Sequence, residues 1–260
     1  MNPFYFGNSR EALFGVYHPP ITMGIRNSAI LICPPLGREY IRTHWALRRL
    51  ADQLAQGGAH VLRFDYFGNG DSAGESGEGN VEHWQNDIRT AADELLELSG
   101  VQKISIVALR AGAALAASTT DLDTSNLVLW DPVINGRSYL DGLRQVYRTK
   151  LEAYNRIRQQ KVKETPDELL GFPLPAAMRS SIEQLDISSG FHNKADSIHV
   201  FSSRKTNNLS QLQEMLEQGG GTFHGEIIND AGDWDQASKV GDAFLPTSIP
   251  AAIAKIFEGT

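Results

Sequence analysis

The chain has 260 residues, of which 41% are apolar and 21% are charged, a composition typical of an ordinary globular domain with one core. Its formal net charge of −7, without a dense face of Lys and Arg, argues against nucleic-acid binding. The single cysteine excludes an internal disulfide, and no leader or run of about 18 apolar residues is present, so we expect a cytoplasmic protein without membrane association.

The first 100 residues alternate between strand and helix patterns. Apolar or alternating runs predict strands at 3–6, 13–17, 29–33 and 59–65, the first two as an antiparallel hairpin. Apolar residues at helical spacing predict helices at 44–56 and 82–98, after a loop at 36–39 and a glycine-rich loop at 66–79 respectively. Such alternation is typical of βαβ units around a mainly parallel sheet.

The stretch from 103 to 117 combines a buried strand, a sharp turn and a helix of small residues. Its Ile- and Val-rich start is typical of a strand buried on both faces. Ala108 and Gly112 bracket Arg110 in the turn, a layout that resembles the nucleophile elbow of α/β-hydrolases. Arg110 stands in the nucleophile position, and a guanidinium that stays protonated cannot attack a carbonyl.

The second half returns to the sheet after an interruption. Strands are predicted at 127–130, 198–202 and 222–228, and helices at 209–218 and 246–257. Between the first two of these strands, residues 137–190 contain helix-like stretches and several prolines, and no strand is expected there. We interpret residues 137–190 as a helical lid inserted into a core made of 1–136 and 191–260.

Five phrases in order resemble the α/β-hydrolase superfamily over nearly the whole chain; they lie at 14–20, 33–51, 61–74, 108–113 and 127–140. Within that superfamily they look like a bacterial subgroup often labelled exosortase-associated or natural-product-cluster hydrolase, which commonly has arginine in the elbow. The resemblance implies an α/β-hydrolase fold, a mainly parallel doubly wound sheet with an inserted helical lid. The resemblance is only a weak guide to the reaction and the substrate, because one fold hosts many chemistries.

The usual Ser-His-Asp set is expected to be degenerate. The acid and the histidine should follow the nucleophile in chain order. The loop at 203–208 has no carboxylate, so Asp131, after the preceding strand, is the candidate acid. The loop at 229–235, where the histidine is expected, contains Asp233 but no histidine, and His224 lies inside a predicted strand, where we expect it to be half-buried.

Two interpretations of Arg110 stay open. In one, its guanidinium lies at the floor of an anion or oxyanion site. Backbone N–H groups would complete that site, from Leu36 or Gly37 and from Ala111. In the other, Arg110 pairs with a carboxylate and fills the pocket, and the candidate partners are Asp131, Asp233 and Glu39. Further side chains that could line the pocket are Glu39, His44, Tyr66, Trp130 and Trp234.

These residues lead to three hypotheses. The first is an atypical enzyme acting on a small acyl or carbonyl metabolite in a biosynthetic pathway, with Asp131 or Asp233 as base or orienter and no serine nucleophile. The second is a catalytically silent homologue that binds a ligand or partner, and the third is an esterase or thioesterase with an unrecognised nucleophile or activated water. The ligand could be carrier-bound, a homodimer stays open, and we expect no metal and no cofactor.

Overall fold

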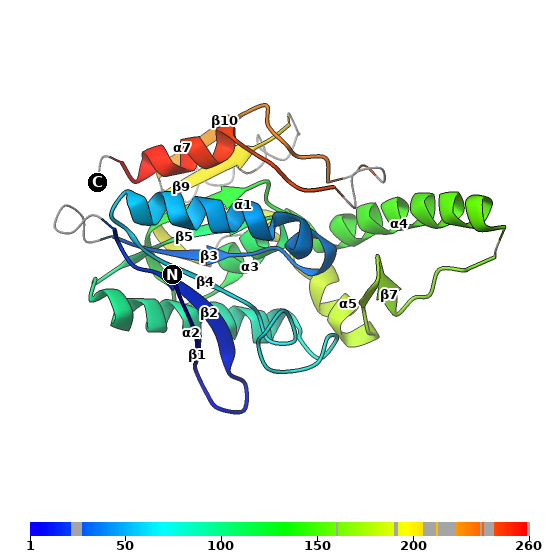
Figure 1. Ribbon diagram of the computed structural model, residues 1–260, viewed down its shortest axis with the longest axis horizontal. Helices are drawn as coiled ribbons and strands as arrows, with labels where there is room; N and C mark the ends of the chain where they lie inside the picture. Colours follow the sequence, from blue (N-terminus) through cyan, green and yellow to red (C-terminus); the bar gives the residue numbers. More distant parts are fainter. Residues whose placement is uncertain are drawn as a thin grey trace.

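The computed structural model describes residues 1–21, 28–159, 161–189, 192–204, 212, 222–234, 236 and 242–258. The described residues form an eight-stranded sheet in the order β1-β2-β4-β3-β5-β6-β9-β10 (Figure 1). Its strands are β1 (Asn2–Phe6), β2 (Leu13–His18), β3 (Ala29–Cys33), β4 (His60–Phe64), β5 (Ile104–Leu109), β6 (Asp123–Trp130), β9 (Lys194–Ser202) and β10 (Thr222–Ile227). The predicted hairpin is confirmed, and all pairings from β4 to β10 are parallel.

The middle of the sheet is buried because helices cover both of its faces. Every residue of β3 and of β5 is buried, as the continuous apolar runs in these strands predict. Strands β6 and β9 each begin four residues earlier than their apolar runs, because their first halves carry polar side chains such as Asp123 and Lys194 that leave no apolar signal.

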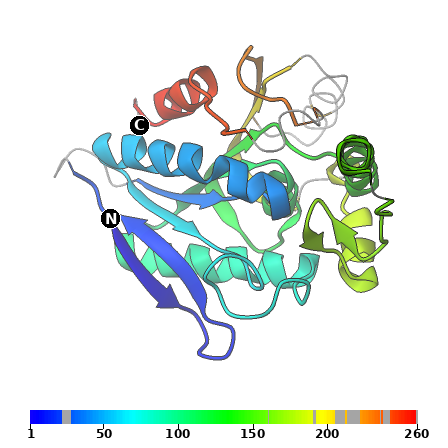
Figure 2. The same cartoon turned by 45° about the vertical axis from the view of Figure 1, so that its right-hand side comes forward.

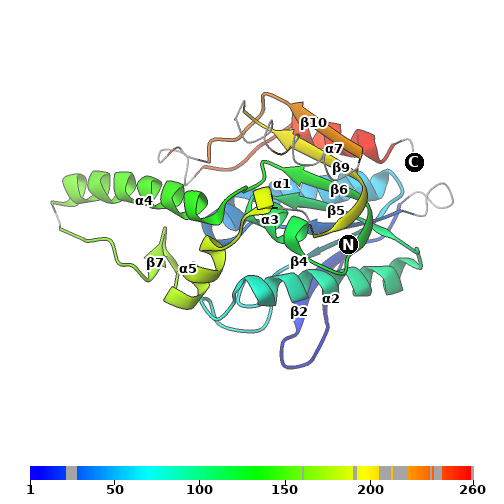
Figure 3. The same ribbon diagram turned by 180° about the vertical axis from the view of Figure 1, so that it is seen from behind.

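The helices lie in two layers (Figures 1 and 3). On one face α1 (Gly37–Gln56) and α7 (Ser248–Ile256) pack over a core that includes Ile30 and Val107. On the other face α2 (Val81–Ser99) and α3 (Ala111–Ser118) pack over a separate core. Side chains of alternating direction along the strands supply the two cores. The α/β-hydrolase fold expected from the sequence is therefore confirmed.

Helix α1 begins seven residues before the helix expected at 44–56. The prediction of a loop at 36–39 is wrong for residues 37–39. These residues form the first turn of α1, after an extended Leu36. This turn carries Arg38 and Glu39, so it lacks the apolar periodicity by which a helix start is recognised. A carboxylate in the first turn of a helix is favourable, since it faces the positive end of the helix dipole. The change moves Glu39 from a loop to a fixed position on α1.

The segment between β6 and β9 is mostly helical. Our expectation that residues 137–190 contain no strand is wrong. The segment contains α4 (Gly136–Arg158), a hairpin of β7 (Glu168–Leu169) and β8 (Phe172–Pro173), α5 (Ala176–Glu183) and a 3-10 turn, η1 (Ile187–Ser189). Strands of two residues are too short to show alternation. The Asn135 side chain caps α4 by accepting a hydrogen bond from the Ser138 amide at 3.0 Å. Helix α4 extends away from the sheet, and Figure 2 views it end-on beside α5.

The carboxy-terminal part is described in pieces. The helix expected at 209–218 lies outside the described residues except Leu212, and the expected strand and terminal helix correspond to β10 and α7. Among the described helices, none combines the length and hydropathy that a bilayer crossing requires.

Candidate functional site

Arg110 occupies a strained turn between β5 and α3. Its φ of 56° and ψ of −121° lie in a region that side chains other than glycine rarely adopt. The Arg110 amide donates to the Trp130 carbonyl of β6 at 3.0 Å, which ties the turn to the sheet. Gly112 allows α3 to approach β3, since a Cβ there would lie 2.2 Å from the Pro34 carbonyl oxygen. The expected elbow geometry is therefore present, with an arginine at its apex.

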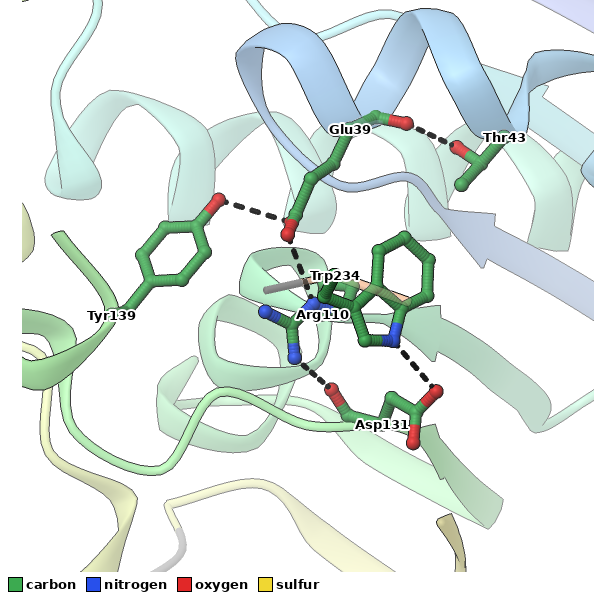
Figure 4. A network of polar contacts seen from close by, with 6 residues as sticks. All are labelled: Glu39, Thr43, Arg110, Asp131, Tyr139 and Trp234. Atoms are coloured by element: carbon green, nitrogen blue, oxygen red, sulfur yellow. Dashed lines mark hydrogen bonds and ion pairs between the residues drawn. The ribbon is translucent and has the colours of Figure 1, made fainter. Parts of the chain in front are cut away.

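The Arg110 guanidinium forms an ion pair with Glu39 of α1 (Figure 4). Nε donates to Glu39 Oε1 at 3.1 Å, and Nη1 donates to the Asp131 backbone carbonyl at 3.2 Å. The Tyr139 hydroxyl of α4 donates to Glu39 Oε2 at 3.1 Å. Only 16% of the Arg110 side chain and 6% of the Glu39 side chain are exposed. Of the three carboxylates considered as partners, Glu39 is therefore the one that pairs with the guanidinium.

Burial and the charges in this network change the pKa values of the two groups that contact Glu39, namely Arg110 and Tyr139. Burial by itself would lower the pKa of Arg110, but the nearby Glu39 carboxylate, with smaller effects of Tyr139 and Asp131, raises that pKa above its ordinary value. The pKa of Tyr139 is raised well above its usual range, first by burial and then by the negative charge of Glu39. At neutral pH Arg110 is thus a cation and Tyr139 a neutral hydrogen-bond donor.

Trp234 stands in the loop where the sequence pattern places a histidine. Its indole Nε1 donates to Asp131 Oδ2 at 2.9 Å, and the Ser203 amide donates to Asp131 Oδ1 at 2.7 Å. The Arg110 Cζ atom lies 4.9 Å from the centre of the Trp234 ring, a cation–π distance (Figure 4). An indole is a donor only and has no basic nitrogen. The histidine position therefore holds a group that cannot act as a general base.

The side chains of the other predicted site residues make no recorded contact with the Arg110 guanidinium. Asp233 accepts hydrogen bonds from Arg204 at 2.5 Å and from Gln236 at 3.1 Å, and no contact joins it to Arg110. Trp130 and Tyr66 are almost fully buried in the cores on opposite faces of the sheet. His44 contacts Tyr40 and lines a different cavity. Among these acids, Glu39 is thus the one whose carboxylate contacts the guanidinium.

Sequence reasoning did not identify Tyr139 as a site residue. Tyr139 lies in the first turn of α4, three residues after Gly136, and a tyrosine at that spacing is indistinguishable from an ordinary apolar position of an amphipathic helix. The Asn135 cap was the available signal, because it fixes where the first turn of α4 begins.

Two backbone amides stand at the starts of helices α1 and α3. Gly37 and Ala111 are the first residues of α1 and α3, and no acceptor for either amide is found in the described part of the chain. The first amides of a helix lack partners within it and favour an oxygen with negative charge. Leu36, Gly37 and Ala111 therefore remain candidates for the oxyanion site.

A mostly apolar pocket begins at Glu39 and Tyr139 and extends under the inserted segment. It comprises about 690 Å³ of space free of atoms, its open mouth included. Side chains of α4, the β7–β8 hairpin and α5 form its apolar walls, among them Leu140, Leu143, Leu170, Phe172, Met178 and Ile182. Leu36 and Gly37 also line it, so the α1 amino terminus reaches the pocket.

No conventional nucleophile is found near a base among the described residues. All seven histidines are described, and none of their recorded hydrogen bonds joins a serine or cysteine. His224 is exposed instead of half-buried, and its ring stacks on that of His199 with centres 4.9 Å apart. Nor do three or more His, Cys, Asp or Glu side chains of the described residues form a group with the spacing of metal ligands.

Comparisons with known proteins agree with this architecture. The family model described as serine aminopeptidase, S33, matches residues 38–183. No curated protein matches the chain at a significant level. The chain is similar in structure to Est1E from Butyrivibrio proteoclasticus bound to ferulic acid, at 14% identity and a TM-score of 0.61, covering 98% of this chain and 96% of that one.

Two further solved structures cover both chains almost completely. The mouse alpha/beta hydrolase domain-containing protein 10 is 14% identical, with a TM-score of 0.59 and 99% of each chain covered. An AqdC variant in complex with its substrate, the Pseudomonas quinolone signal, is 11% identical, with a TM-score of 0.60 and 100% of each chain covered. At these identities the likeness shows the fold and leaves the chemistry to the residues described above.

Proposed function

Since the chain belongs to the serine aminopeptidase family S33 of the α/β-hydrolase superfamily and carries Arg110 at the nucleophile position, we propose an enzyme that forms no acyl-serine intermediate. Its substrate is a small acyl or carbonyl metabolite, and its reaction is proton transfer next to the carbonyl. The observation that carries this proposal is the buried Glu39–Arg110 pair, of which Glu39 lines the end of an apolar pocket. A carboxylate beside fixed cationic and amide donors is suited to enolate chemistry.

Glu39 is assigned as the base in this reaction. Its carboxylate takes the proton from the carbon next to the carbonyl, and the electron pair of that C–H bond moves to the carbonyl oxygen as an enolate. The enolate oxygen receives hydrogen bonds from the Arg110 guanidinium and from the Gly37 and Ala111 amides. Glu39 then returns the proton to the same carbon or to a conjugated one. The product is an isomer or epimer of the substrate, and no atom is gained or lost.

Asp131 has an orienting role in this scheme. Its carboxylate holds the Trp234 indole, whose ring covers one face of the Arg110 guanidinium. Residues 137–190 serve as the lid that excludes water from the pocket, and a biosynthetic role with a carrier-bound substrate belongs to the same proposal through the resemblance to natural-product-cluster hydrolases. The AqdC variant has a similar fold, and its reaction is described as cleavage of a ring of its substrate. This similarity is a precedent for a reaction on this fold that is not described as ester hydrolysis.

Deuterium exchange tests the proposal. Wild-type protein is incubated in deuterium oxide with a panel of β-keto esters and acyl thioesters, and deuterium at the carbon next to the carbonyl is measured by mass spectrometry. We expect exchange with the wild type and a loss of about 100-fold or more in Glu39→Gln, the size usual for a missing general base. Exchange that is equal in the two proteins would refute the assignment. Labelling of the wild type by a fluorophosphonate would instead reveal an ordinary serine hydrolase.

A second candidate is binding without turnover. It is favoured by the saturation of the two carboxylates: each Glu39 oxygen and each Asp131 carboxylate oxygen already accepts a hydrogen bond. A metabolite screen by thermal shift, followed by mass spectrometry of the recovered ligand, separates the two functions. A stabilising ligand that returns unaltered supports binding, and one that returns isomerised or deuterated supports catalysis.

A further inference from the structure

A second cavity lies between α1 and strands β2 and β4, on a different side of that helix from Glu39. It comprises about 460 Å³ of space free of atoms, its open mouth included, and shares no lining residue with the pocket under α4. Val16 and Leu47 contribute apolar walls, and the polar side chains that line it are Tyr40, His44, Arg63, Asp65 and Asp71. The proposed function uses none of these side chains.

His18 holds the Arg63 guanidinium in place. Arg63 Nε is 3.2 Å from His18 Nε2, and because a guanidinium nitrogen can only donate, Nε2 must be the acceptor. The proton of the neutral ring is therefore on Nδ1, which donates to Asp52 Oδ1 at 2.9 Å. Burial, and then the charge of Arg63, lower the pKa of His18, in agreement with a neutral ring. An Asp–His pair thus orients the guanidinium without neutralising it by contact.

The Arg63 guanidinium lacks a counter-ion. No carboxylate oxygen of the described residues lies within 4.0 Å of its nitrogens, and the N–H groups on Nη1 and Nη2 have no acceptor there. Arg63 is partly buried, and desolvation lowers its pKa. The four N–H groups on Nη1 and Nη2 are therefore left to water or to a bound group.

The carboxylates of the cavity do not supply that acceptor. Asp65 is 8% exposed, its Oδ1 accepts from the Tyr40 hydroxyl at 2.5 Å, and its Oδ2 accepts from the Asp71 amide at 3.0 Å. These bonds hold the turn at Gly70, where a Cβ would lie 2.1 Å from Asp65 Oδ2. His44 makes no recorded hydrogen bond, and burial lowers its pKa, so a neutral imidazole N–H is a further donor. The polar side-chain groups of the cavity without a recorded hydrogen bond are therefore the Nη groups of Arg63, the exposed His44 imidazole and the exposed Asp71 carboxylate.

We propose that this cavity binds a small oxyanion, a carboxylate or phosphoryl group on a compact apolar body, through the Nη groups of Arg63 and the imidazole of His44. A planar guanidinium fork matches two oxygens of such a group. The apolar walls of Val16 and Leu47 accommodate the remainder of the ligand. The site is independent of the reaction at Glu39 and Arg110.

Titration calorimetry with propionate, inorganic phosphate and ethylammonium tests the proposal. We expect saturable binding of propionate or phosphate and none of ethylammonium, and the better of the two anions identifies the group recognised. Arg63→Met should weaken binding at least tenfold. His44→Phe is the second variant, because it fills the cavity and leaves the His18–Arg63 contact intact, and it should also abolish binding. Arg10→Met, at an exposed arginine, is the matched control and should bind like the wild type.

Three results would overturn the proposal: no saturable binding of either anion by the wild type, preferential binding of ethylammonium, or equal anion affinity in wild type and His44→Phe. The variant Leu143→Trp, which narrows the pocket under α4, shows which of the two cavities binds the anion. Anion binding unchanged in this variant supports the second cavity, whereas anion binding lost only in this variant assigns it to the first pocket and refutes the inference. The deuterium-exchange test at Glu39 is unaffected by either result.

Discussion

Replacement of Glu39 by glutamine tests the central feature of the site, the buried pair between α1 and the elbow. Glutamine retains the size of the side chain and one oxygen that can accept from Arg110, but its NH2 group replaces the oxygen that accepts from Tyr139, and it leaves the guanidinium without a counter-charge. Because only 6% of the Glu39 side chain and 16% of the Arg110 side chain are exposed, solvent screens the pair little. Breaking such a pair on one side typically costs about 3–5 kcal/mol.

We expect Glu39→Gln to lie near the lower end of this range, at about 3 kcal/mol, because its hydrogen bonds are partly retained. In a domain of this size each kcal/mol lowers Tm by about 2–4 °C, so the expected decrease is about 6–12 °C. Urea unfolding followed by circular dichroism measures the free energy of unfolding, and Glu97→Gln, at an exposed position of α2, is the matched control.

A double-mutant cycle separates the pair from the size of the side chains. Arg110→Met and Glu39→Leu should each destabilise strongly, whereas the double variant should recover most of the loss, because replacing both charges by apolar groups is often nearly neutral. The reasoning is refuted if Glu39→Gln unfolds within about 1 kcal/mol of the wild type, or if the two single losses simply add in the double variant.

Three further predictions concern the elbow and one buried acid. Arg110→Ser with Trp234→His should restore a nucleophile and base beside Asp131, giving fluorophosphonate labelling and an esterase rate about 100-fold or more above either single variant; failure to label would show that the two loops do not retain triad geometry. Gly112→Ala should lower stability by about 1–3 kcal/mol in thermal unfolding, since its Cβ would meet a backbone oxygen. Burial raises the pKa of Asp87 to about 6, so its contribution to stability is fully present below about pH 4 and is lost as pH rises through 6; Asp87→Asn should flatten the pH dependence of Tm in that interval.

The fold was predictable because its signals are local and mutually consistent. The apolar strands at 29–33 and 104–109, each followed by a tight turn and a helix, fit only a mainly parallel sheet covered on both faces. The starts of β6 and β9 and the β7–β8 hairpin were missed, since polar or two-residue strands have no alternation from which to infer them.

The candidate site was only partly predictable because its contacts join residues far apart in the chain. The sequence pattern placed Arg110 and Asp131 after two successive strands and Trp234 after the last strand, and these three do meet. The partner of the guanidinium stayed undecided among three carboxylates, since the choice depends on where α1 begins. The first turn at Gly37 settles it, because this turn directs Glu39 toward the elbow.

The residues at the three positions where a triad is expected depend on one another. A guanidinium at the elbow apex needs an anion within hydrogen-bond reach, and Glu39 is that anion. A histidine over the guanidinium would lose basicity beside a fixed positive charge, whereas the Trp234 ring gains a cation–π contact and still donates to Asp131. Tyr139 then satisfies the second oxygen of Glu39 from the inserted segment.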